Sequence, residues 1–292
     1  TRGSAVNAAL PGGIEQAVAA AKAADIVILA IGESQDMSGE AQSRTAIELP
    51  PAQQALAEAV VQAGKPMIVL LRHGRALALH GAVAGANAVL ATWFLGSEAG
   101  NGIADILFGS VDPSGKLPVS FPWESGQEPF YYDRKSTGRP VTGTATEYKA
   151  RYATTDNSAR YPFGHGLSYT KFELQDLRLS NAVMQWDEAI EIRVRVANVG
   201  KRRGSEVVQL YVRDRVASRT RPIRELKRIQ HLMLAAAATT EIRFYLARAD
   251  LEFVGAGARF IAEPGSFDLW IGQSSVDGLH SRFTLAPKPA LP

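Results

Sequence analysis

Three short apolar runs in the first third of the chain constrain its fold more than any other feature. They span residues 26–31, 66–71 and 88–94, and segments with helical spacing lie around them at 14–24, 52–63, 76–84 and 97–107. A continuous apolar run is typical of a strand buried on both faces of a parallel sheet. Gly64 is expected to end the second helix as a C-cap. The sequence therefore predicts a parallel sheet covered by helices, an α/β sandwich, over residues 1–122.

The pattern changes near Pro113. Residues 123–165 are rich in glycine, proline and aromatic residues without periodicity, which predicts an ordered linker that lies on the domains. Alternating apolar and polar residues then predict antiparallel strands and an immunoglobulin-like or fibronectin type III-like sandwich over residues 166–292. The fold class is α/β plus all-β. The clearest expected strands are 172–179, 190–197, 207–213, 239–247 and 265–272.

Composition excludes several classes of protein. The chain is 46% hydrophobic and 21% charged, which excludes disorder, and it has no cysteine for disulfides or thiolate metal sites. No apolar run is long enough to span a bilayer, and no secretory apolar segment is visible near Thr1. The five histidines show no ligand spacing, so neither a metal site nor a cofactor is predicted.

The net charge of +3 arises from a basic excess between Arg193 and Arg228. The arginines there alternate with apolar residues, which favours the solvent face of strands over a nucleic-acid surface. Nucleic-acid binding stays open as an alternative and would show a steep salt dependence.

A polar loop with three carboxylates follows the first apolar run. It holds Glu33, Asp36 and Glu40. In a parallel α/β sheet, ligands bind beyond the carboxyl ends of the strands, so these acids are expected at a ligand site. Acidic, glycine-containing loops suit acid/base chemistry or carbohydrate binding. A solvated connection without function remains the alternative from spacing alone.

The segment from Met37 to Pro50 resembles the acid/base loop of bacterial glycoside hydrolase family 3 enzymes of the β-glucosidase and β-xylosidase type. It has the glutamate Glu40, Arg44 four residues on, and then Leu49-Pro50. Other matching motifs follow in the family's order at 25–33, 74–75, 93–100, 104–109, 113–118, 137–140, 161–169, 204–211, 221–226 and 263–267.

The sequence departs from the family at residues 235–240 (AAAATT), where the family has a Pro-Gly turn. This departure predicts a locally less stable sandwich.

The resemblance implies a function and its residues. Glu40 would be the general acid/base of a retaining, exo-acting β-glycosidase that hydrolyses terminal β-linked sugars, and Met37 and Ser38 would contact the substrate. The nucleophile would be an aspartate on an N-terminal (β/α)8 barrel that is expected to be absent from this chain, which would then be inactive alone. The implied partners are that barrel and an oligosaccharide or β-glucoside, with no nucleic acid and no membrane, and the implied location is periplasmic or secreted. A non-catalytic carbohydrate- or partner-binding module is the alternative.

The remaining polar residues near the strand ends are expected to be structural. Glu33 would accept N–H bonds from the loop, and Asp36 would be a turn residue. Arg44 would pair with a loop acid and fix its conformation. His73 and Trp93 would pack in the core rather than act on a substrate.

Overall fold

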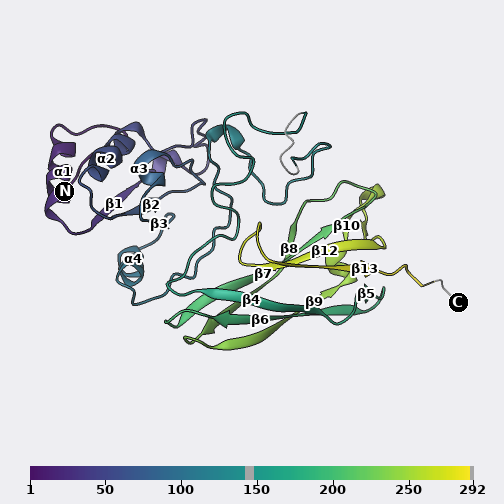
Figure 1. The fold of residues 1–292 in the computed structure, drawn as a ribbon. Coiled ribbons are helices and arrows are strands. Elements are labelled where there is room, and N and C mark those ends of the chain that lie inside the picture. The colour runs from purple at the N-terminus through teal and green to yellow at the C-terminus, as the bar shows by residue number, and fades with distance from the viewer. Residues whose placement is uncertain (142–147, 290–292) are drawn as a thin grey trace. The chain divides into compact units, whose positions relative to one another are not determined.

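The structure is a computed structural model that describes residues 1–141 and 148–289. It divides into two compact units (Figure 1). The first comprises Thr1–Leu107 with Phe121–Pro129, and the second Phe108–Ser120 with Phe130–Pro292. The boundaries expected after residues 122 and 165 stay a prediction, and residues 142–147 of the expected linker lie outside the described residues. The described segments contain no helix long and apolar enough to cross a bilayer.

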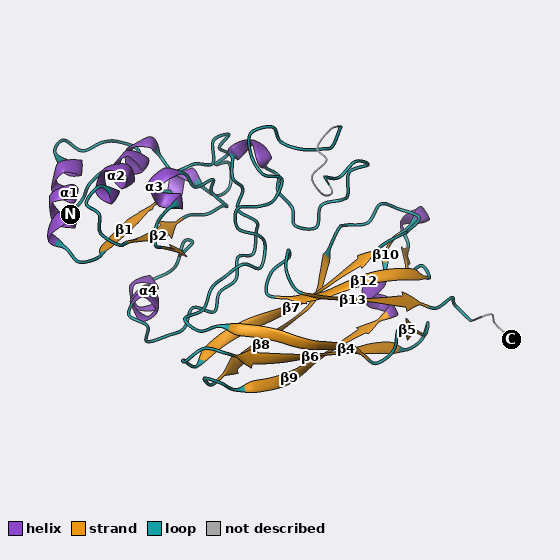
Figure 2. Cartoon of the chain, in the orientation of Figure 1, coloured by secondary structure: helices purple, strands orange, loops and turns teal. Residues whose placement is uncertain are grey.

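The first unit is an α/β structure (Figure 2). Its elements are α1 (Gly13–Ala23), β1 (Val27–Gly32), η1 (Gln35–Met37), α2 (Pro51–Val61), β2 (Met67–Arg72), α3 (Gly81–Ala84), β3 (Ala88–Ala91), α4 (Ala99–Leu107) and η2 (Ser125–Gln127). The strands pair in parallel in the order β1-β2-β3, with Val27 opposite Met67 and Ile68 opposite Ala88. Helix α2 packs against β1, α1 and α3. The expected α/β class is confirmed.

The apolar runs predicted that the sheet is buried on both faces, and this prediction is wrong. In β1, Leu29 and Ile31 are buried, whereas Ile28 is 48% exposed and Ile26, just before the strand, is 55% exposed. Helix α4 has no buried residue, so it does not seal a sheet face. An apolar run shows that a strand can be buried on both sides, but the covering elements decide whether it is.

The helix expected over residues 76–84 is restricted to α3. The preceding residues Leu77, Ala78 and Leu79 are extended and buried. Ala78 forms a parallel bridge with Glu48, and its N–H donates to the carbonyl of Ile47 at 2.9 Å. Three consecutive apolar residues fit a buried extended segment as well as a helix, and here the pairing of Ala78 with Glu48 decides between the two.

The second unit is a sandwich of two sheets with the strand orders β5-β13-β12-β7-β8 and β4-β6-β9. All pairs are antiparallel except β5 with β13. Side chains from both sheets form one apolar core that includes Ile192, Leu210 and Phe283. The fibronectin type III-like architecture is confirmed. The strands are β4 (Phe172–Leu179), β5 (Val183–Met184), β6 (Ala189–Asn198), β7 (Gly204–Asp214), β8 (Glu225–Leu234), β9 (Thr239–Ala247), β10 (Phe253–Val254), β11 (Phe260–Ile261), β12 (Gly265–Gly272) and β13 (Leu279–Leu285), with 3-10 turns η3 (Arg248–Leu251) and η4 (Ala256–Ala258).

Part of the aromatic segment before the sandwich packs on strand β7. Tyr132 stacks on Phe163 at 4.1 Å between ring centroids and meets Tyr211 of β7 edge-on at 6.0 Å. Tyr211 is fully buried, and its hydroxyl donates to the side chain of Gln209 at 2.5 Å. These contacts explain why β7 is buried along most of its length although it belongs to a two-layer sandwich.

Arginines of the basic cluster lie on the solvent face of β6, as expected. Arg193 and Arg195 are exposed between buried apolar neighbours. Arg193 pairs with Glu191 and Arg195 with Asp176, so much of their positive charge is balanced locally.

Candidate active site

The acidic loop begins where β1 ends, at Gly32. This residue has φ of 144°, and a Cβ atom there would collide with the backbone of Arg72. The buried side chain of Gln53 accepts the Gly32 N–H at 2.6 Å and donates to its carbonyl at 2.8 Å. The next residue, Glu33, donates its N–H to the Arg72 carbonyl at 2.8 Å. The loop therefore leaves the carboxyl edge of the sheet at a fixed point.

Glu33 is the anchor of the loop. Its side chain is fully buried, and its Oε1 atom lies 2.7 Å from Nη1 of Arg44 and 3.1 Å from Nε of Arg75. Its Oε2 atom accepts the N–H of Gly74 at 3.1 Å. The pairing of Arg44 with a loop acid is confirmed. Glu33 is structural, as expected, but the N–H that it accepts belongs to Gly74 after β2 and not to its own loop. We call the group formed by Glu33, Arg44 and Arg75 the Glu33 clamp.

The two arginines of the Glu33 clamp also hold the loop backbone. Nη2 of Arg75 donates to the carbonyl of Met37 at 2.5 Å and to that of Gln42 at 2.9 Å. Nη2 of Arg44 donates to the carbonyl of Glu48 at 2.8 Å. The bonds from Arg75 to this loop were not predicted from the sequence. The available signal was that Arg75 follows β2, the strand beside β1, so that it lies at the same edge of the sheet as the loop. The loop is thus fixed on both sides of Glu40.

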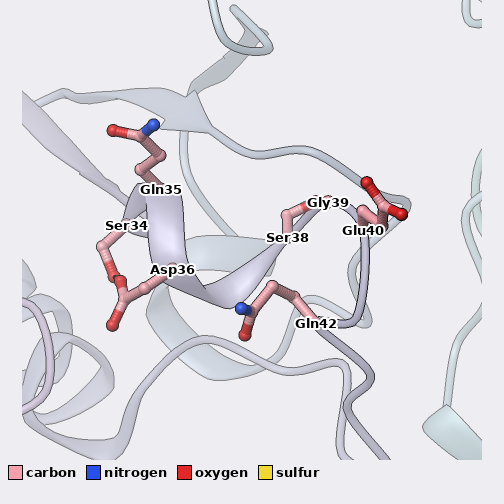
Figure 3. Close-up of a pocket in the computed structure, with 7 residues that line it drawn as sticks. All are labelled: Ser34, Gln35, Asp36, Ser38, Gly39, Glu40 and Gln42. Carbon is pink, nitrogen blue, oxygen red and sulfur yellow. Dashed lines mark hydrogen bonds between the residues drawn. The ribbon is translucent and has the colours of Figure 1, made fainter.

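Glu40 lies at the tip of this tied loop and is exposed. It sits in a turn closed by a 3.2 Å bond from the Gln42 N–H to the Gly39 carbonyl, with Gly39 at φ 125° and Ala41 at φ 60°. Figure 3 shows its carboxylate pointing away from the loop. Among the described residues, none forms a hydrogen bond or ion pair with this carboxylate, so it is open to an incoming group.

Glu40 borders an open hollow on the loop, and the other predicted site residues relate to it differently. The lining residues are Ser34, Gln35, Asp36, Ser38, Gly39, Glu40 and Gln42. Ser38 is therefore beside Glu40, whereas Met37 is not part of the lining and presents its carbonyl to Arg75. Substrate contact by Met37 and Ser38 stays a prediction.

Asp36 lines the same hollow as Glu40, but its carboxylate accepts a hydrogen bond. The Ser34 hydroxyl donates to its carboxylate, and this bond lowers the pKa of Asp36 below its ordinary value. The residue lies in the 3-10 turn η1, which confirms the expected turn role. A carboxyl held ionised in this way is a poor proton donor near neutral pH.

Gly74 lets the loop approach the end of β2. A Cβ atom at Gly74 would collide with the side chain of Ser38 and would lie 2.7 Å from Cε2 of Phe94. The absence of a side chain at Gly74 therefore sets the position of Ser38.

His73 packs behind this contact, as expected. It is fully buried, its Nδ1 lies 2.7 Å from the Arg75 carbonyl, and its ring centroid lies 4.3 Å from that of Trp93 and 5.5 Å from that of Phe121. Burial lowers the pKa of His73, so the neutral imidazole is favoured.

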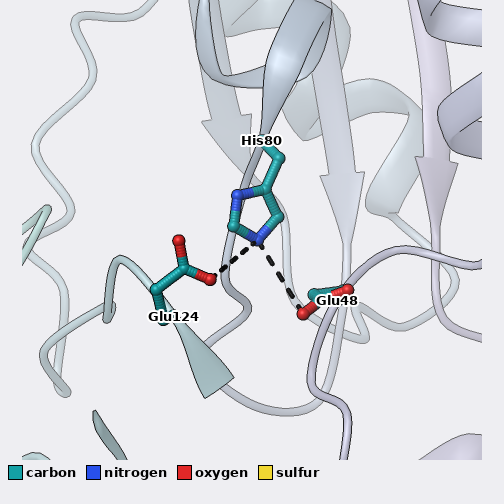
Figure 4. A group of neighbouring side chains, drawn as sticks. All are labelled: Glu48, His80 and Glu124. Carbon is teal, nitrogen blue, oxygen red and sulfur yellow. Dashed lines mark ion pairs between the residues drawn. The ribbon is translucent and has the colours of Figure 1, made fainter. Parts of the chain in front are cut away.

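A second polar group of the first unit was not predicted. Nε2 of His80 lies 3.9 Å from a carboxylate oxygen of Glu48 and 3.9 Å from one of Glu124 (Figure 4). The three residues are far apart in the sequence and follow no ligand-spacing motif, so only the fold brings them together.

Two family models match this chain. The profile of the "Glycosyl hydrolase family 3 C-terminal domain" matches residues 4–169, and that of the "Fibronectin type III-like domain" matches residues 206–275. A periplasmic β-glucosidase of Salmonella typhimurium is 43% identical over 273 residues, covering 93% of this chain and 36% of that protein. A putative β-xylosidase of Formosa agariphila is 37% identical, again over 93% of this chain and 36% of the relative. The chain thus spans little more than a third of these relatives.

Solved structures show the same relationship. A β-glucosidase from Listeria innocua in complex with gluconolactone superposes with a TM-score of 0.92 at 35% identity, covering 97% of this chain and 39% of that one. A mutant of the same enzyme, with an aspartate replaced by alanine, was solved with laminaribiose and gives a TM-score of 0.91.

Proposed function

The chain belongs to glycosyl hydrolase family 3, and from this premise we propose that it supplies the general acid/base, Glu40, to a retaining, exo-acting β-glycosidase. It corresponds to a C-terminal portion of β-glucosidase-like members of the family. The enzyme would hydrolyse terminal β-linked sugars.

The exposed carboxylate of Glu40 carries this proposal. A general acid/base needs a carboxyl that is free to reach the leaving oxygen and is held by a positioned segment. Glu40 combines the two, because its own carboxylate has no bonding partner in the described parts of the chain while the Glu33 clamp ties the backbone around it. The neighbouring acids suit the role less well, since Glu33 is buried in the clamp and Asp36 is stabilised as an anion by Ser34.

The reaction would proceed in two steps. In the first, Glu40 donates its proton to the glycosidic oxygen while a second carboxylate attacks the anomeric carbon, and the bond to the leaving group breaks. In the second, the Glu40 carboxylate takes a proton from water, which attacks the same carbon and releases the sugar. The two carboxyls must lie about 5–5.5 Å apart for this retaining course. We propose that the second is an aspartate of a (β/α)8 barrel outside these 292 residues.

The proposed substrates are β-glucosides and related oligosaccharides, with β-xylosides as a second sugar type. The names of the relatives from Salmonella typhimurium and Formosa agariphila support these classes. A periplasmic or secreted location is proposed on the same basis, from the periplasmic β-glucosidase.

The test is made in the enzyme assembled with its barrel domain. Glu40→Ala is expected to lower turnover of substrates with poor leaving groups by about 10²–10⁴-fold, because these depend on protonation. Substrates with activated aryl leaving groups should lose much less in the glycosylation step. Asp36→Ala is the matched control from the same hollow and should lose little on either substrate. Unchanged turnover in Glu40→Ala would refute the assignment, and glycan binding without any turnover of the assembled wild type would favour a binding module.

A further inference from the structure

The cluster of Glu48, His80 and Glu124 lies outside the acidic hollow and is not used by the proposed reaction. One ligand atom from each side chain lies within 4.8 Å of the other two. All three belong to the first unit, and they come from the end of the acidic loop, the residue before α3, and the returning segment at 121–129. We propose that Glu48, His80 and Glu124 bind one divalent transition-metal ion of the Zn²⁺ type.

The donor set selects this class of ion. One imidazole nitrogen and two carboxylate oxygens are ligands that Zn²⁺ accepts, with water completing a tetrahedron. An imidazole is a poor ligand for Ca²⁺ or Mg²⁺, which prefer an all-oxygen set. Two carboxylates also supply the negative charge that offsets a divalent cation.

The spacing of the three ligand atoms is somewhat wider than a bound zinc ion requires. Tetrahedral ligands about 2.0–2.1 Å from zinc lie roughly 3.4 Å from one another. The two His80–carboxylate distances are 3.9 Å, and all three ligand atoms lie within 4.8 Å of one another, so the carboxylates must close in by up to about 1.4 Å. The three side chains are between 37% and 52% exposed, so they are free to rotate by that amount. Figure 4 shows the imidazole edge directed between the two carboxylates.

The backbones that carry the ligands are already fixed to one another. Glu48 is bridged to Ala78, two residues before His80, with buried Ile47 and Leu49 on either side of it. The Ser125 hydroxyl, next to Glu124, accepts the Ile47 N–H at 3.0 Å and donates to Glu48 at 3.3 Å. Little ordering of the chain is therefore required for binding.

The ion would have a structural role. It would join three segments of the first unit and hold Glu48, whose carbonyl is bound by Arg44 of the Glu33 clamp. Zinc binding would thus stabilise the C-terminal end of the loop that carries Glu40. This effect does not depend on the proposed reaction, and its test needs no turnover.

The test uses the full 292-residue chain, free of affinity tag and stripped of metal, with Zn²⁺ alone as the probe. Calorimetry should give one ion per chain, and Zn²⁺ should raise the melting temperature. His80→Gln, Glu48→Gln and Glu124→Gln should each weaken binding at least tenfold. The two glutamate changes keep an acceptor for the bonds to Ser125 and Gln127, so the fold is preserved, and circular dichroism of the metal-free variants checks it.

His231→Gln is the matched control, because His231 is an exposed histidine of β8 in the second unit. It should bind Zn²⁺ like the wild type. Absence of one-to-one binding in the wild type would overturn the proposal. So would wild-type affinity in His80→Gln, or an equal loss in His231→Gln.

Discussion

The Nε atom of Arg75 lies 3.1 Å from Oε1 of Glu33, whose side chain is fully buried. The same oxygen is 2.7 Å from Nη1 of Arg44, so one carboxylate pairs with two guanidinium groups. This arrangement couples the stability of the first unit to the position of the loop that carries Glu40.

Glu33→Gln should destabilise the first unit. The change keeps the shape of the side chain but leaves two partly buried arginines without their counter-charge, which costs at most the roughly 3–5 kcal/mol of a fully buried pair. Urea unfolding followed by tryptophan fluorescence measures the loss. Asp36→Asn, an exposed carboxylate change in the same loop, should cost less than about 0.5 kcal/mol. Equal effects of the two changes would show that the clamp adds no stability.

Arg75→Lys should loosen the loop without removing the charge. A lysine cannot bond the carbonyls of Met37 and Gln42 together with Glu33 as the arginine does. Loss of one charge-assisted bond, worth about 1.5–3 kcal/mol, should speed exchange of the Gln42 N–H, which bonds the Gly39 carbonyl, by roughly tenfold or more. Arg72→Lys is the control, because Arg72 is an exposed arginine at the end of β2, and exchange should stay at the wild-type rate. Wild-type exchange in Arg75→Lys would contradict this role.

His73→Phe should flatten the acid dependence of stability. Burial lowers the pKa of His73, so below the ordinary value near 6.5 the unfolded chain binds a proton that the folded chain resists. The wild type therefore loses this part of its stability as pH falls from about 7 to 5. Phenylalanine retains an aromatic ring beside Trp93 and Phe121 but does not titrate. Urea midpoints at several pH values should fall less steeply in the variant, and parallel curves would exclude the effect.

Ala237→Gly should stabilise the second unit. Ala237 lies in the turn between β8 and β9 with φ of 58°, a left-handed conformation that disfavours a Cβ atom. The expected gain is about 0.5–1 kcal/mol in thermal unfolding. Ala236→Gly, in the same turn but without a positive φ, should give no gain. The left-handed φ of Ala237 is the physical reason why we expect residues 235–240 to be less stable than a turn with glycine at this position.

Local patterns predicted the fold class well but missed details that depend on tertiary contacts. The alternation in β6 and the apolar run of β1 are properties of adjacent residues, so their strands were predicted correctly. Strand β8 is only partly buried and rich in charge, and the pattern did not single it out. Residues 77–79 were assigned to a helix because their bridge to Glu48 is invisible in the sequence.

The same limit applies to the site. The pairing of Arg44 with a loop acid was predicted because both residues belong to the same loop, whereas the catalytic role of Glu40 stays a prediction. Arg75 reaches the loop from the end of the next strand, and His80 meets Glu48 and Glu124 only through folding. Contacts between distant segments require the register of the sheet, which a single sequence does not specify.

The most direct test of the central claim is the product that Glu40→Ala forms in azide. In the enzyme assembled with its barrel domain, an activated aryl β-glucoside should still form the glycosyl-enzyme intermediate, which would turn over slowly without the general base. Azide needs no base and should accelerate turnover while giving the β-configured glycosyl azide, detected by NMR. Absence of this product, with azide leaving the rate unchanged, would contradict the assignment of Glu40 as the general acid/base.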